Sequence, residues 1–141
     1  MFNFFNNKKK SIDLNNNYIK IGCLLIHAAK IDQHYTIDEK EIIKKTLIEL
    51  GANKDEINVI IKNAEINEEN SNQIINFTKE IKNLEENKKI MIVEALWKII
   101  YSDSKSDIYE TNLMRRLTGL LYLDNKIMSE IKEKVKKEFT K

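Results

Sequence analysis

The sequence DQHYTIDE, residues 32–39, returns in altered form as DSKSDIYE at residues 103–110. Each stretch follows an apolar run with helical spacing, begins with an aspartate and ends with a glutamate seven residues later. The same 71 residues separate the two aspartates (32 to 103) and the two glutamates (39 to 110). The pattern predicts two acidic helix–loop–helix corners at equivalent places in a helical protein.

Apolar residues recur at helical spacing along most of the remaining chain. Helices are expected to begin near residues 14, 36, 53, 74, 86, 107 and 124, and Thr36, Asn53 and Asp124 are suitable N-capping residues. The polar segment 67–71 is expected to be a connection. Proline is absent and glycine occurs three times, so few residues interrupt the helices. We therefore predict an all-α fold, a compact bundle of about seven helices.

The offset of 71 residues extends beyond the corners. Without a gap it aligns Ile19 with Ile90, Ile21 with Ile92, Leu25 with Leu96, Leu50 with Leu121 and Ile60 with Ile131. We predict two related three-helix units, residues 14–65 and 86–139, joined by a short fourth helix. Together they would form a single domain over residues 14–141, after a flexible N-terminal segment at residues 1–13.

The composition narrows the class of protein. With 42% hydrophobic and 33% charged residues in 141, the chain is typical of a soluble globular protein. A net charge of +2 is nearly balanced and argues against nucleic-acid binding. No apolar run approaches the roughly 20 residues of a transmembrane helix. The single cysteine, Cys23, excludes an intrachain disulfide and a cysteine-based zinc site, and favours a cytoplasmic location. Homo-oligomer formation stays open.

Helix capping explains the two glutamates without any ligand. Glu39 is the third helical residue after Thr36, and Glu110 holds the same place after Asp107. A carboxylate there accepts a hydrogen bond from the capping residue's amide and interacts favourably with the helix dipole, which stabilises the helix by about 1 kcal/mol. On this interpretation the corners are structural.

Capping does not explain the two aspartates. Asp32 and Asp103 each follow the C-terminal end of an apolar helix, where the dipole disfavours an anion. A divalent cation held by carboxylate oxygens and loop carbonyls would compensate, and Ca²⁺ or Mg²⁺ takes such ligands. The candidate ligands are Asp32, Glu39, Asp103 and Glu110. The residues alone leave both interpretations open, capping and metal binding.

Other candidate residues fit structural roles. Trp97 and Tyr101 lie on an apolar helix and are expected in the core. Arg115 and Arg116 align with Lys44 and Lys45, and a solvated basic face is the simplest interpretation. Because the sequence contains neither a glycine-rich phosphate loop nor a nucleophile elbow, we do not expect an enzyme.

The second corner carries a family resemblance. Asp103-Ser-Lys-Ser-Asp-Ile-Tyr-Glu110 is followed by Leu113-Met-Arg-Arg-Leu117 and Leu120-Leu121. With Leu96-Trp97 and Phe77-Thr78, this pattern resembles the TerB (tellurite resistance protein B) family, over nearly the whole chain after about residue 14. One departure is that Gln33 and Ser104 stand where the family usually has a glycine after the aspartate.

The resemblance implies an all-helical, cytoplasmic, bacterial protein associated with tellurite resistance and related stress responses. It also implies divalent metal binding by acidic residues, which here map onto Asp32, Glu39, Asp103 and Glu110. The resulting hypothesis is a non-enzymatic protein that binds Ca²⁺ or Mg²⁺ weakly and acts through other proteins. The alternative is a purely structural scaffold for protein–protein interaction, without metal.

Overall fold

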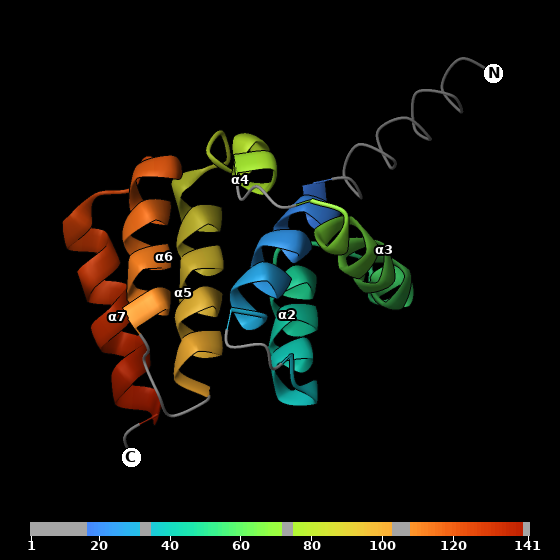
Figure 1. Ribbon diagram of the computed structural model, residues 1–141, viewed down its shortest axis with the longest axis horizontal. Coiled ribbons are helices and arrows are strands. Elements are labelled where there is room, and N and C mark those ends of the chain that lie inside the picture. Colours follow the sequence, from blue (N-terminus) through green and yellow to red (C-terminus); the bar gives the residue numbers. More distant parts are fainter. Residues whose placement is uncertain (1–16, 32–34, 72–74, 103–107, 140–141) are drawn as a thin grey trace.

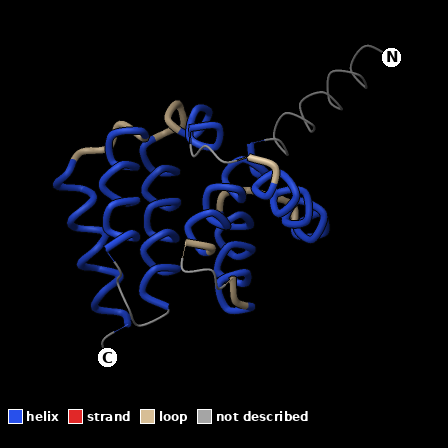
Figure 2. The backbone as a smooth tube through the Cα atoms, in the orientation of Figure 1, coloured by secondary structure: helices blue, strands red, loops and turns tan. Residues whose placement is uncertain are grey.

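The computed structural model describes residues 17–31, 35–71, 75–102 and 108–139. All regular elements in these ranges are helical, which confirms the predicted all-α fold (Figure 2). A helix over residues 17–29 is followed by α2 (Ile37–Glu49), α3 (Ile57–Glu69), α4 (Ile75–Ile81), α5 (Glu86–Ser102), α6 (Ile108–Leu120) and α7 (Asn125–Phe139). The predicted flexible segment, residues 1–13, lies outside the described residues.

The helices form two neighbouring groups (Figure 1). In one group α5, α6 and α7 run alongside one another, and in the other helix 17–29 lies with α2 and α3. Helix α5 packs against α7 in its own group and against α2 in the other, so it joins the two. The short α4 lies near one end of the bundle and contacts α6. No helix in the described part of the chain is long and apolar enough to cross a membrane.

Helix 17–29 and α5 supply much of the core. Leu24, Leu25 and Ile26 are fully buried, and Leu96 and Ile99 of α5 are at most 1% exposed. Consecutive buried residues cover most sides of a helix, because each step along the chain turns it by about 100°. These two helices therefore occupy the middle of the bundle, where a helix that is apolar on most sides is stable.

Helices α2 and α6 end in the same way, 71 residues apart. Both are followed by a residue with positive φ, Gly51 at 120° and Tyr122 at 56°. At the end of α2, Gly51 N donates to Ile48 O (3.0 Å) and Ala52 N donates to Leu47 O (2.9 Å). At the end of α6, Tyr122 N donates to Gly119 O (3.3 Å) and Leu123 N donates to Thr118 O (3.2 Å). This is the Schellman arrangement, which satisfies the last carbonyls of a helix.

The same offset recurs in two side-chain contacts. The Tyr18 hydroxyl donates to the Leu50 carbonyl at 3.5 Å, and the Lys89 ammonium donates to the Leu121 carbonyl at 3.0 Å. The following helical segments are capped alike: Asn53 Oδ1 accepts from Asp55 N at 2.9 Å and Asp124 Oδ1 accepts from Lys126 N at 3.0 Å. The two halves therefore share helix ends, caps and interhelical contacts.

The halves differ in how the third helix begins. Asn53 caps a single 3-10 turn, Lys54–Glu56, and α3 starts only at Ile57. In the second half α7 starts at Asn125, directly after the capping residue. The register nevertheless returns to the 71-residue offset, because Ile57, Ile60 and Ala64 are buried like their equivalents Met128, Ile131 and Val135.

Candidate functional site

Glu39 lies at the N-terminus of α2 in a complete capping box. Its Oε1 accepts from the Thr36 amide at 2.9 Å and from the Thr36 hydroxyl at 3.0 Å, and the Glu39 amide donates to Thr36 Oγ1 at 3.1 Å. Glu39 is only 1% exposed. The capping role predicted for Glu39 is confirmed, and the positive end of the helix dipole stabilises its buried charge.

Tyr35 of the first corner packs against the hydrophobic core. Its hydroxyl is buried and has no hydrogen-bond partner among the described residues. Burial raises the pKa of Tyr35, and the charges of Glu65 and then Glu39 raise it further. Lys40 lies 3.2 Å from Glu65 and offsets part of this charge. The corner thus combines the capping carboxylate of Glu39, the ion pair of Lys40 and Glu65, and a buried hydroxyl.

The other three predicted ligands cannot be placed beside Glu39. Asp32 and Asp103 lie outside the described residues, and so does the side chain of Glu110, whose backbone belongs to the first turn of α6. Within the described part of the chain, no three or more His, Cys, Asp or Glu side chains are arranged to hold a metal ion. The four-residue metal site stays a prediction.

A second acidic group, Glu68, was missed by the sequence analysis. It is 8% exposed and bridges α3 to helix 17–29. Lys30 Nζ lies 2.8 Å from its Oε2, and His27 Nδ1 lies 3.5 Å from its Oε1. The expectation that residues 67–71 form a connection was wrong for residues 67–69, because α3 continues to Glu69. Lys30, directly after helix 17–29, compensates the unfavourable position of Glu68 near the helix C-terminus.

Cys23 takes part in the same interface without being reactive. It is fully buried, and its Sγ donates to the Ala64 carbonyl at 3.4 Å. Burial is the largest cause that raises the pKa of Cys23, to about 11. A protonated, inaccessible thiol is a packing group rather than a nucleophile or metal ligand.

Comparison with known proteins places the chain in a family. The profile of the family described as Tellurite resistance protein TerB matches residues 19–133. Searches of curated proteins and of solved structures gave no significant match. The matched region covers most of the chain, from helix 17–29 to α7, and every regular element in the described part of it is a helix. On these grounds the chain belongs to the TerB family.

Proposed function

We propose that this TerB-family protein is a non-enzymatic, cytoplasmic helical protein of tellurite or related stress responses. It binds a divalent cation weakly at its acidic corners and acts through other proteins. The observation that supports the metal component most directly is the carboxylate of Glu39, which is 1% exposed and lies shortly after the acidic loop. The charges of Glu65 and Glu39 both raise the pKa of the buried Tyr35 hydroxyl, and a bound cation would balance part of this negative charge.

The proposed ligands are Asp32 with Glu39 in the first corner and Asp103 with Glu110 in the second. Carboxylate oxygens select hard cations, so Ca²⁺ or Mg²⁺ is the appropriate ion. Two carboxylates at each corner are few for a Ca²⁺ site, which usually has 6–8 oxygen ligands. The affinity should therefore be low, with Kd in the millimolar range.

Thermal unfolding with and without metal tests this proposal. For a Kd of about 1 mM, about 10 mM Ca²⁺ stabilises the folded state by about 1.4 kcal/mol, which raises Tm by about 4 °C in a domain of this size. Asp32→Asn with Asp103→Asn should abolish the shift. A control with the same loss of charge is Asp55→Asn with Glu130→Gln, at two exposed positions, and it should keep the shift.

Isothermal titration calorimetry gives the second measurement. Heat of binding that disappears in the Asp32/Asp103 variant and persists in the control would support metal binding at the corners. No heat and no thermal shift at about 10 mM of either metal would exclude the metal component.

A scaffold without metal is the second candidate. It is favoured by the capping box itself, because Thr36 and Glu39 already satisfy each other through three hydrogen bonds. On this hypothesis the Asp32/Asp103 variant should unfold within about 0.5 kcal/mol of the wild type with or without Ca²⁺. Thermal unfolding with and without Ca²⁺ therefore separates the two candidates.

The partner component has support on the outer side of α3. Val59 is 63% exposed and Ile66 is 48% exposed, and seven residues bring them to the same face of the helix. A photo-crosslinking residue at position 59 should join a partner that can then be purified. Binding of that purified partner should weaken in Val59→Ser with Ile66→Ser, and it should not change in the control Lys136→Gln, at an exposed position on α7.

A further inference from the structure

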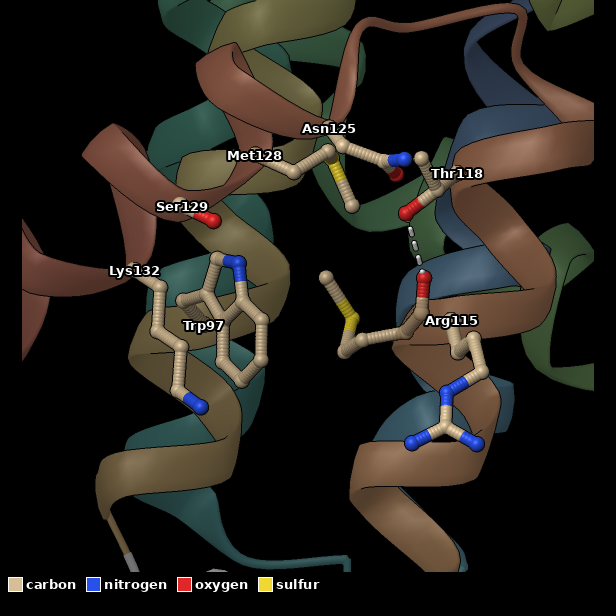
Figure 3. Close-up of a pocket in the computed structure, with 8 residues that line it drawn as sticks. Trp97, Arg115, Thr118, Asn125, Met128, Ser129 and Lys132 are labelled. Atoms are coloured by element: carbon tan, nitrogen blue, oxygen red, sulfur yellow. Dashed lines mark hydrogen bonds between the residues drawn. The ribbon is translucent and has the colours of Figure 1, made fainter.

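The second half of the molecule contains a small pocket between α5, α6 and α7 (Figure 3). Its volume is about 270 Å³, just below the roughly 300–1,000 Å³ of typical small-molecule sites. Its floor is apolar, with Trp97, Met114 and Met128 almost completely buried. Its rim is polar, and includes Asn125 and Ser129 from α7. A pocket of this size suits a compact ligand rather than a peptide.

Trp97 provides an unused hydrogen-bond donor in this pocket. The residue is 5% exposed, and its Nε1 is buried without a partner among the described residues. Figure 3 shows the indole nitrogen at the end of the ring next to Met128 and Asn125, and the head groups of Lys132 and Arg115 toward its other end. Tyr101 stacks on the indole, with centroids 5.8 Å apart, and holds it in place.

The charges around the pocket all have the same sign. Arg115 and Lys132 line it, and no carboxylate does. Lys132 Nζ lies 5.3 Å from the centroid of the Trp97 ring. Neither cation forms an ion pair with a described carboxylate within 4.0 Å. The hydroxyl of Thr118 donates to the Met114 carbonyl at 2.9 Å, so its proton is already used. The remaining donors favour a ligand that accepts hydrogen bonds and carries negative charge.

The first half of the chain shows that this pocket is not a necessary result of the fold. At the 71-residue offset, Trp97, Thr118 and Lys132 correspond to Ile26, Leu47 and Ile61. Those three residues are 0%, 0% and 1% exposed and form part of the close-packed core. Arg115 corresponds to Lys44. The second half therefore places an indole N–H, a hydroxyl and an ammonium where the first half has only aliphatic side chains.

The geometry points to a binding site for a small organic anion in this pocket. A carboxylate of the ligand lies toward the cations of Arg115 and Lys132, which line the pocket. A compact apolar body contacts Met114 and Met128. The site is separate from the acidic corners and does not depend on metal binding there.

Trp97, the only tryptophan of the chain, reports directly on the pocket. Titration with cyclohexanecarboxylate at constant ionic strength should move the single indole N–H signal in a ¹⁵N–¹H spectrum saturably, because the ligand packs against the Trp97 ring that lines the pocket. Cyclohexanecarboxamide has the same shape without the charge, and should bind at least about tenfold more weakly. No saturable shift, or equal shifts with both compounds, would overturn the proposal.

Substitutions then locate the binding. Arg115→Gln and Lys132→Met should each weaken cyclohexanecarboxylate binding by about tenfold, because each removes a charge beside the carboxylate. The control Arg116→Gln changes the adjacent exposed arginine and should bind like the wild type. Thr118→Leu introduces the residue of the first half and should fill the pocket, with binding lost and Tm unchanged or raised. Binding unaffected by Arg115→Gln and Lys132→Met, or equally weakened by Arg116→Gln, would refute the site.

Discussion

The end of α2 depends on a backbone conformation that is largely restricted to glycine, so Gly51→Ala should destabilise the fold. Gly51 has φ of 120°, outside the left-handed helical region that other residues occasionally adopt. Such strain costs about 1–3 kcal/mol. The new Cβ would also lie 2.7 Å from the Tyr18 hydroxyl, which would have to give up its 3.5 Å contact with the Leu50 carbonyl.

These effects add up to about 2–3 kcal/mol, and the lower entropy of the unfolded alanine chain offsets about 0.4–1 kcal/mol of it. The free energy of unfolding should therefore fall by about 2 kcal/mol, and Tm by about 6 °C. Urea denaturation followed by circular dichroism measures the first value and a thermal scan the second. If the m value, the slope of the unfolding free energy against urea concentration, is the same in the wild type and the variant, their stabilities can be compared on a two-state basis.

The equivalent position in the second half provides the control. Tyr122 has φ of 56°, carries a side chain already and is 71% exposed. Its contact with Lys82, 5.7 Å from the ring centroid, is weak. Tyr122→Ala should therefore change the stability by no more than about 0.5 kcal/mol. If Gly51→Ala costs as little as Tyr122→Ala, the reasoning from backbone strain is refuted.

Three further predictions concern buried polar groups. Glu39→Ala should lower the free energy of unfolding by about 1 kcal/mol in urea denaturation, and Glu39→Gln, which keeps an acceptor, by less. Glu68→Ala should cost about 1–2 kcal/mol because Lys30 loses its 2.8 Å partner and keeps only the 3.9 Å contact with Glu69, and adding Lys30→Ala should restore part of the loss in a double-mutant cycle. Burial raises the pKa of Cys23 from 9.0 to about 11, so the unfolded thiol loses its proton at lower pH than the folded one. Stability should then fall as pH rises from about 9 to about 11, and Cys23→Ala should reduce this fall.

The sequence predicted those features that depend on neighbouring residues. Helical spacing was sufficient for the all-α fold, and the Thr36–Glu39 capping box followed from four consecutive positions, since its hydrogen bonds are local. The core position expected for Trp97 is confirmed. The division into units at residues 14–65 and 86–139 stays a prediction, although the two halves share the hydrogen bonds described above.

Contacts between helices could not be predicted in the same way. The hydrogen bond between Lys30 and Glu68 joins residues 38 positions apart and depends on how helix 17–29 packs against α3. The sequence alone does not reveal this contact, so the polar residues 67–71 resembled a connection. Arg115 is exposed, as expected for a solvated face, and only the arrangement of three helices shows that it also lines a pocket. The metal ligands Asp32, Asp103 and Glu110 remain predictions, because their side chains lie outside the described residues.

The Lys89 ammonium, which is bound at the end of α6, can serve as a chemical probe of local opening. Lys89 is the one buried lysine among the described residues, at 9% exposure, and it is bound to the Leu121 carbonyl. Amine-reactive reagents should therefore label it far more slowly than the exposed lysines, and only when α5 and α6 separate. The labelling rate of this single amine, read by mass spectrometry, would measure how often the second half opens while the molecule remains otherwise native.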